Sequence, residues 1–339
     1  MKRAQQQGID RRPFLVLIGC LLVAGVACSG FSSDPLSISP RLAWPPEDPR
    51  VSLEAVIAPR LQAAAGGKWV RWLTGQPPSP LFHRPYAAAW QDETLLVADP
   101  GAGRVARIGA RGRIHLSPGD LFQDPIGVAA CRAGVVVSDA RAGKLALLDE
   151  DLKLVRWLAV DLSRPTGVAC SDDRIFVAET AAHRIVILEA DGSRRLLGGR
   201  GTAPGEFNFP TAVSVAGDSL WVGDVLNFRI QRLDLASGEF LASFGQLGDA
   251  AGEMPRIKGI AVDRAGHLWV SDAHLDQVSL YTPDGTFLMA FGRRGADAGE
   301  FSFPAGIAAH ADGRVAVVDS LNRRVQVFRS IDREPETES

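Results

Sequence analysis

Short apolar runs of strand length alternate with turn residues from about residue 85 to residue 330. Residues that favour tight turns separate the runs, as at Asp191-Gly192, Pro283-Asp284-Gly285 and Asp312-Gly313. No run between them is long enough for a helix that crosses between parallel strands. This alternation predicts an all-β domain built from antiparallel meanders.

A marker recurs six times in this region: an acidic residue ends an apolar run, and a polar, usually basic, residue follows five positions later. Successive acids are 40, 40, 45, 48 and 47 residues apart. Such a period is typical of propeller blades rather than helical solenoids, so six four-stranded blades are predicted. The pairs are Asp99 and Arg104, Asp139 and Lys144, Glu179 and Arg184, Asp224 and Arg229, Asp272 and Gln277, and Asp319 and Arg324.

The five-residue spacing has a structural explanation. The acid ends the second strand of a blade, four residues turn the hairpin, and the polar partner starts the third strand. The two side chains can therefore meet across the turn and fix the register. An active site needs one special constellation rather than six equivalent ones, so we interpret these pairs as structural.

The start of each repeat carries a second marker, a proline followed two positions later by glycine or alanine. In the fifth repeat isoleucine replaces the proline. The six starts are Pro85-Tyr86-Ala87, Pro125-Ile126-Gly127, Pro165-Thr166-Gly167, Pro210-Thr211-Ala212, Ile257-Lys258-Gly259 and Pro304-Ala305-Gly306.

The later repeats resemble a known family. Residues 301–307 and 317–328, together with the linkers at 244–253 and 291–301, resemble the NHL repeat. The resemblance covers about 245 residues and is strongest in the last four repeats. It implies a six-bladed β-propeller of the NHL type. Residues 44–51 further resemble the N-terminal segment of bacterial NHL-repeat lipoproteins.

The sixth repeat supplies only three strands, at about 305–309, 314–318 and 324–328. Its fourth strand must come from elsewhere, because an open sheet edge invites association. We predict that residues 50–57 provide it and so close the ring. Residues 60–74 have tryptophans at helical spacing and are predicted to form a short helix that caps the ring.

The N-terminal residues 1–27 predict a lipoprotein-type signal peptide, because a basic start precedes 14 apolar or small residues. That run is too short for a comfortable transmembrane helix. Cys28 follows it and is the expected lipidation site, whereas cleavage at Cys20 would leave too short an apolar core. Arg11-Arg12 also resembles a twin-arginine signal, so the export route stays open.

These features predict a cell-envelope lipoprotein that faces the periplasm. The expected order is a flexible tether at 28–48, the propeller at 49–330 and a charged tail at 331–339. Ser29 favours the outer membrane if sorting follows the common enterobacterial pattern.

Charge argues against nucleic acid as a partner. The chain has 37 basic and 39 acidic residues, and removal of residues 1–27 leaves 33 and 38, a formal charge of −5. No basic field remains to attract nucleic acid. NHL-repeat relatives that bind RNA or belong to ubiquitin ligases are therefore no guide to this chain.

Cys131 and Cys170 lie in neighbouring repeats, at slightly different positions. Their placement permits a disulfide without requiring one. We expect two buried thiols that pack as small apolar groups.

The sequence has no motif of nucleophilic or metal-dependent catalysis such as G-x-S-x-G or H-E-x-x-H. Some NHL propellers resemble peptidyl-amide lyases that hold zinc with histidines around the channel, but here no three histidines share a repeat position. We therefore expect no metal and no cofactor. The six histidines are His83, His115, His183, His267, His274 and His310.

The hairpin loops between second and third strands should emerge on one face as a ring of variable side chains. We interpret this face as a binding surface for a protein partner or an extracytoplasmic ligand. The alternative is a lyase or hydrolase with its site at the central channel. Arg200, Arg293 and Arg294, in the linkers, are expected on the opposite face. The candidate binding residues are His183, Asn227, Phe228, His274, Asp276, Asn322 and Arg323.

Overall fold

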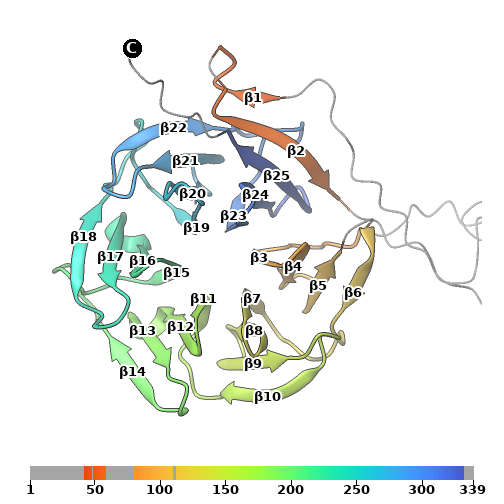
Figure 1. The fold of residues 1–339 in the computed structure, drawn as a ribbon, viewed down its shortest axis with the longest axis vertical. Helices are drawn as coiled ribbons and strands as arrows, with labels where there is room; N and C mark the ends of the chain where they lie inside the picture. Colours follow the sequence, from red (N-terminus) through yellow and green to blue (C-terminus); the bar gives the residue numbers. More distant parts are fainter. Residues whose placement is uncertain (1–41, 48, 59–79, 110–111, 332–339) are drawn as a thin grey trace, which may run out of the picture. The chain divides into compact units, whose positions relative to one another are not determined.

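Six β-sheets are arranged radially around a central axis in a computed structural model of the chain (Figure 1). The structure describes residues 42–47, 49–58, 80–109 and 112–331. Each sheet is an antiparallel meander whose first strand lies nearest the axis. The predicted all-β, six-bladed propeller is confirmed.

Five blades are built from consecutive strands. Blade 1 contains β3 (Ala87–Gln91), β4 (Thr94–Asp99), β5 (Arg104–Ile108) and β6 (Ile114–Leu116). Blade 2 contains β7 (Pro125–Cys131), β8 (Gly134–Asp139), β9 (Lys144–Leu148) and β10 (Leu154–Ala159), and blade 3 contains β11 (Pro165–Ser171), β12 (Arg174–Glu179), β13 (Arg184–Leu188) and β14 (Arg194–Leu197). Blade 4 contains β15 (Pro210–Ala216), β16 (Ser219–Asp224), β17 (Arg229–Asp234) and β18 (Phe240–Phe244), and blade 5 contains β19 (Ile257–Val262), β20 (Leu268–Asp272), β21 (Gln277–Tyr281) and β22 (Phe287–Phe291).

Blade 6 joins segments from far apart in the sequence. Its strands β23 (Pro304–Ala309), β24 (Arg314–Asp319) and β25 (Arg324–Ser330) are completed by β2 (Val51–Ile57), which pairs antiparallel with β25. The predicted closing strand is thereby confirmed. A further short strand, β1 (Ala43–Trp44), pairs with β2, so the last residues of the predicted tether belong to the sheet.

Several sequence predictions lie outside the described residues. They are the signal peptide with Cys28, most of the tether, the helix at 60–74 and the tail from residue 332. In the part of the chain that the structure describes, no helix is long and apolar enough to cross a membrane.

The small residue two positions after each starting proline lets neighbouring inner strands approach closely. A Cβ atom on Gly127 of β7 would lie 2.1 Å from the Thr166 carbonyl oxygen of the next blade. Between blades 6 and 1 the Gly306 N–H donates to the Tyr86 carbonyl at 2.7 Å. The small residue of the repeated proline-x-small sequence therefore allows the inner strands to pack closely enough to form a narrow channel.

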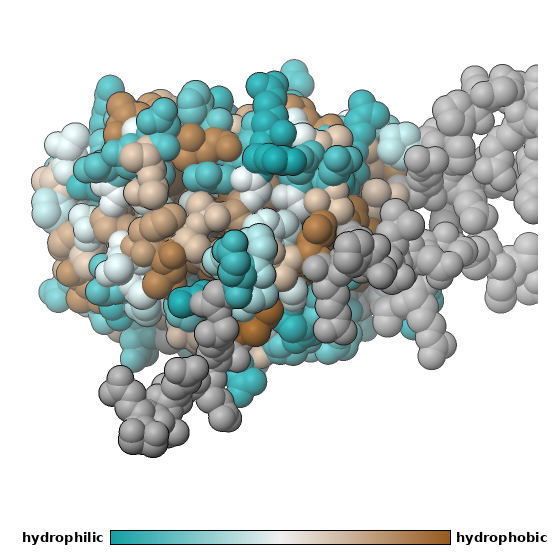
Figure 2. All heavy atoms as spheres, turned by 90° about the horizontal axis from the view of Figure 1, so that it is seen from above, coloured by the Kyte–Doolittle hydropathy of each residue, from teal (hydrophilic) through white to brown (hydrophobic). Residues whose placement is uncertain are grey.

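Apolar side chains fill the space between blades. Between blades 5 and 6, the rings of Trp269, Phe301 and Phe328 surround Phe291 at centroid distances of 4.9 to 6.2 Å. Trp44 of β1 packs on the same cluster, 5.3 Å from Phe291. The side view in Figure 2 shows hydrophobic and hydrophilic residues interspersed on the outer surface, with no continuous apolar face in this view.

The six repeated acids are almost completely buried, with relative exposures of 0 to 3%. Each accepts a hydrogen bond from a backbone N–H one or two residues before the proline or isoleucine that starts its own repeat, at 2.6 to 3.1 Å. Each also lies directly opposite its predicted partner in the strand register. Ion pairs join three of these pairs among the described residues: Glu179 with Arg184, Asp224 with Arg229, and Asp319 with Arg324.

In blades 4 and 6 the arginine of the pair also binds the linker that precedes the blade. The Arg229 guanidinium donates to the carbonyls of Thr202, Ala203 and Glu206, in the linker that precedes blade 4. The Arg324 guanidinium likewise donates to three carbonyls between residues 296 and 300. The acid holds the start of the first strand and the arginine holds the linker before it.

Cys131 and Cys170 form a disulfide, with Cα atoms 5.5 Å apart. The expectation of two buried thiols is wrong. The cysteines stand at or near the ends of β7 and β11, inner strands of adjacent blades, and the convergence of inner strands toward the axis brings them together.

Asp319→Ala should lower the free energy of unfolding by about 3 to 5 kcal/mol, because it leaves the buried Arg324 guanidinium without its charge partner. The backbone N–H of Ser302 and the Asn322 amide also lose their acceptor. Urea unfolding measures the change. Asp151→Ala, which removes an exposed ion pair with Lys153, is the matched control and should cost less than about 1 kcal/mol. Equal values for the two variants would contradict a structural role for the buried acid.

Candidate functional site

The inner strands of the six blades line a central channel that contains a cavity of about 70 Å³. Four of the side chains that line it come from the position directly after the starting proline or isoleucine: Tyr86, Ile126, Thr211 and Lys258. They differ from blade to blade, so the channel is chemically asymmetric although the backbone repeats.

The residues directly before the starting proline or isoleucine encircle one end of this channel. We call them the mouth ring: Arg84, Asp124, Arg164, Phe209, Arg256 and Phe303. The three arginines are exposed and the other three residues are half-buried. Blades 1 to 3 therefore present charged side chains, whereas on blades 4 to 6 two phenylalanines flank one arginine.

Three residues of the mouth ring have a left-handed backbone, with φ of 55° at Arg164, 56° at Phe209 and 58° at Phe303. This conformation costs non-glycine residues roughly 1 to 2 kcal/mol each. It persists only where the surroundings impose it, and such strain is concentrated at functional sites.

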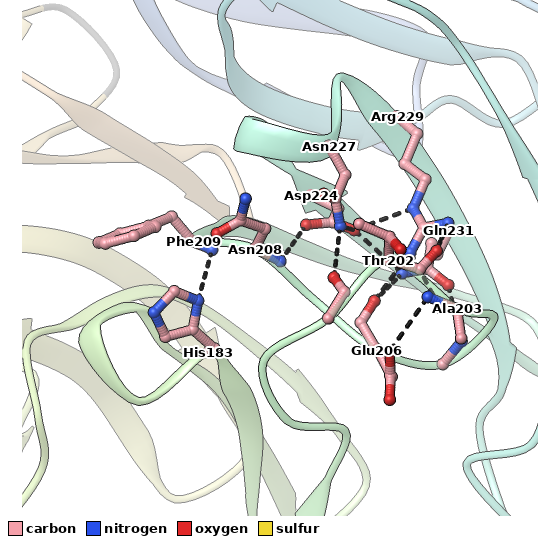
Figure 3. Close-up of polar contacts among 12 residues, drawn as sticks. His183, Thr202, Ala203, Glu206, Asn208, Phe209, Asp224, Asn227, Arg229 and Gln231 are labelled. Atoms are coloured by element: carbon pink, nitrogen blue, oxygen red, sulfur yellow. Dashed lines mark hydrogen bonds and ion pairs between the residues drawn. The ribbon is translucent and has the colours of Figure 1, made fainter.

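Two of the predicted binding residues impose this conformation. The His183 Nδ1 atom accepts a hydrogen bond from the Phe209 N–H at 3.2 Å, and the two rings lie 4.4 Å apart (Figure 3). The Asp276 carboxylate accepts from the Phe303 N–H at 2.7 Å. In both cases a hairpin residue of one blade holds the mouth-ring phenylalanine of the next blade.

Lys258 of blade 5 lies near aromatic rings of the next two blades. Its Nζ atom lies 5.6 Å from the Phe303 ring centroid and 5.9 Å from that of Tyr86. The pKa of Lys258 is lowered from 10.5 to about 8, mainly by burial and also by the nearby charges of Arg256 and Arg164, while Asp272 opposes them. Burial also raises the pKa of Tyr86 to about 12.

Within the mouth ring and Lys258, cations outnumber acids. Arg84 lies 3.8 Å from Asp124, whose pKa is raised by burial. Among the described residues, no acid forms an ion pair with Arg164, Arg256 or Lys258. The mouth ring and Lys258 together hold four cations and one acid.

A hydroxyl in the channel also has no partner. The Thr211 Oγ1 atom is buried and makes no hydrogen bond to any described residue. A buried polar atom without a partner costs about 1 to 3 kcal/mol, so it is a natural contact for a bound water or ligand.

The hairpins that were predicted to form a binding face lie at the same end as the mouth ring, because the last residue of each second strand, in blades 2 to 6, pairs with the first residue of the inner strand. Asn227 donates to the Gly201 carbonyl and to Asp224 (Figure 3), and Asn322 donates to the Gly295 carbonyl and to Asp319. Their amides hold linkers rather than face solvent. Of the other candidates, His274 and Arg323 are exposed and Phe228 is half-buried.

The expected position of the linker arginines is wrong. Arg294 lies 4.0 Å from Asp276, and the carbonyls of Gly201 and Gly295, which neighbour Arg200 and Arg294, accept hydrogen bonds from hairpin asparagines. The linkers therefore cross the same end of the propeller as the hairpins, because each outer strand finishes there before the chain enters the next blade.

The mouth ring and Lys258 were missed from the sequence. Comparison of the repeats selects positions where the blades have the same residue type. The mouth ring and Lys258 instead occupy the positions directly before and directly after the starting proline or isoleucine, where the residue type varies. The signal that could have found them is that cations and aromatic residues fill those positions in a repeat that is otherwise regular. In the described ranges, no group of three or more His, Cys, Asp or Glu side chains is placed to hold a metal ion.

Comparison with known proteins agrees with this architecture. Residues 301–328 match the NHL repeat. No curated protein sequence matches the chain. The chain is thus an all-β six-bladed propeller with an NHL repeat in its last blade.

Solved structures with a similar fold have different functions. A catalytically inactive virginiamycin B lyase from Staphylococcus aureus with quinupristin has a TM-score of 0.54 and 16% identity, over 73% of this chain and 95% of the lyase. A gluconolactonase from Xanthomonas campestris has a TM-score of 0.58 and 16% identity, over 82% and 98%. An auxiliary nutrient binding protein from Bacteroides thetaiotaomicron has a TM-score of 0.59 and 12% identity, over 73% and 69%. At these identities the likeness shows the fold alone.

Lys258→Met should raise the free energy of unfolding at pH 7 by about 1 to 3 kcal/mol. The folded pKa is about 8 and the ordinary value is 10.5, so the unfolded chain holds this proton more tightly. The cost to the folded state is complete below pH 8 and disappears as the pH rises toward 10.5. Chemical unfolding of both proteins at pH 7 and pH 10.5 measures the difference. A gain that is the same at both pH values would contradict the burial of a charged lysine.

Proposed function

We propose that the protein is a lipid-anchored, extracytoplasmic binding protein whose ligand site is the mouth ring and the channel below it. The observation that carries the proposal is the set of unpaired cations and strained phenylalanines at one end of an otherwise regular ring. Strained backbone and unpaired charge that occur together around one opening are typical of a binding site. The hairpin residues His183 and Asp276 support the site by holding its aromatic side chains.

The rigid propeller suits binding. Each mouth-ring residue is attached to a first strand whose start is fixed by a buried carboxylate, so the site is organised before a ligand arrives. The likeness to a nutrient binding protein is consistent with this role, although the same fold also serves a lyase and a gluconolactonase.

Export is supported by two independent features. Residues 1–27 have the order of a signal peptide followed by Cys28. The disulfide between Cys131 and Cys170 is typical of proteins from oxidising compartments such as the periplasm.

Replacement of the lipidated residue should abolish acylation of the protein. We expect wild-type protein in the membrane fraction and labelled by a fatty-acid analogue, and Cys28→Ser protein to be unlabelled. Cys20→Ser is the matched control and should behave as wild type. Labelling of the Cys28→Ser protein would show that the anchor has been assigned to the wrong residue.

The ligand site is tested by thermal unfolding against panels of extracytoplasmic sugars, amines, organic acids and short peptides. At a concentration about 100 times its Kd, a ligand should raise the Tm of the wild type by roughly 5 °C. Phe303→Ala should abolish the shift. Arg132→Ala, which removes an exposed arginine just after the far end of β7, is the control and should retain it. A shift that survives Phe303→Ala would place the ligand elsewhere.

The second candidate is a lyase that uses the same mouth. Lys258, with its pKa near 8, would be the base that removes a proton from a substrate. The two candidates differ in their pH dependence. A turnover rate that rises through pH 8 favours the lyase, whereas binding by the lysine ammonium weakens over the same range.

A further inference from the structure

We propose that the ligand is a small organic acid whose oxyanion enters the channel beside Lys258 and Thr211, while its apolar part lies against the phenylalanines of blades 4 and 6. This inference rests on the proposed function and names the chemical class of its ligand. The oxyanion is a carboxylate or a phosphate, which share the chemistry on which the argument depends.

The charge of the site favours an anion. Lys258, Arg164 and Arg256 lie close enough to one another for each arginine to oppose protonation of the lysine. Three cations without an ion-pair partner among the described residues repel each other, and an anion placed between them relieves that repulsion. Asp124 and Asp272 are the acids that act on this group, and Arg84 faces Asp124 at 3.8 Å.

An unpartnered donor for the anion belongs to a residue in the wall of the cavity. Thr211 lies in blade 4, next to blade 5, which carries Lys258, and both residues line the cavity. The buried Thr211 hydroxyl lacks a partner among the described residues. A hydroxyl that donates to an ionised oxygen makes a stronger hydrogen bond than one between neutral groups.

The size of the cavity restricts what enters it. Its volume of about 70 Å³ is several times the roughly 10 to 15 Å³ that one water molecule requires. That space fits a carboxylate or phosphate group with a few waters. The rest of the ligand must therefore remain at the mouth ring.

The phenylalanines of the mouth ring determine which chemical group the ligand carries outside the cavity. Phe209 and Phe303 are half-buried, and the Arg256 guanidinium carbon lies 5.6 Å from the centre of the Phe303 ring. The backbone N–H groups of both phenylalanines are held by the preceding hairpins. A planar or apolar group would pack against these rings, directly outside the anion site.

The inference is tested by calorimetric titration of the full-length protein at pH 7 and low salt. The probes are phenylacetate, phenyl phosphate, the neutral phenylacetamide, acetate and inorganic phosphate. We expect phenylacetate or phenyl phosphate to bind at least about tenfold more tightly than the neutral phenylacetamide. The same probe should also bind at least about tenfold more tightly than the small anion that lacks the ring, which is acetate for phenylacetate and inorganic phosphate for phenyl phosphate. The stronger of phenylacetate and phenyl phosphate identifies the oxyanion.

Variants connect the binding to the named residues. Lys258→Met should weaken the oxyanion about tenfold or more, Lys258→Arg should restore it, and Arg132→Ala should bind as wild type. From pH 7 to pH 9 the wild type should lose affinity because Lys258 loses its proton, whereas the Lys258→Arg protein should not. Tyr86, with a pKa of about 12, does not titrate in this range.

The outcomes separate this inference from the proposed function. If phenylacetamide binds as tightly as the oxyanions, or if Lys258→Met retains their affinity, the organic-acid inference is overturned. It is also overturned if no probe binds. In each of these cases the proposed binding function still stands if the thermal panel finds a ligand whose Tm shift is lost in Phe303→Ala. It falls if the panel finds no such ligand.

Discussion

The structure depends on one interaction that recurs in every blade, a buried carboxylate that accepts hydrogen bonds from the backbone just before the first strand. A carboxylate in an apolar interior must have its charge compensated, and backbone N–H groups and arginines provide this compensation. The interaction fixes where each inner strand begins. Because the mouth-ring residue lies immediately before that point, the interaction that stabilises the fold also positions the candidate site.

The regular backbone and the irregular site use neighbouring positions of the same repeat. The small residue two positions after the starting proline or isoleucine must be shared, because the next blade's backbone occupies the space of a larger side chain. The residues before that starting position, and four of the six directly after it, meet no such limit, since they encircle the mouth or line the cavity. A sixfold scaffold can therefore carry six different side chains around one opening, and this asymmetry gives the ring its chemical character.

The fold could be predicted from the sequence because its determinants are local and repeated. The acid-to-base spacing set the hairpin register, and the missing fourth strand of blade 6 required a segment such as residues 50–57. The disulfide could not be predicted, because the approach of Cys131 to Cys170 depends on how two inner strands converge. Asn227 and Asn322 resembled free loop residues because their carbonyl partners lie 26 and 27 residues earlier in the chain. The mouth ring was missed since its members share a place in the blade and not a residue type.

The hairpin of β1 and β2 has a mechanical consequence. Tension applied to the chain at Leu42 reaches β1 first, and β1 is held by two pairs of residues with β2 and by the packing of Trp44 on Phe291 and Phe328. That short strand would detach before any load reached the longer ladder between β2 and β25. A pull on the chain from its N-terminal side would thus be absorbed by the detachment of a two-residue strand, and the circular arrangement of blades would survive it.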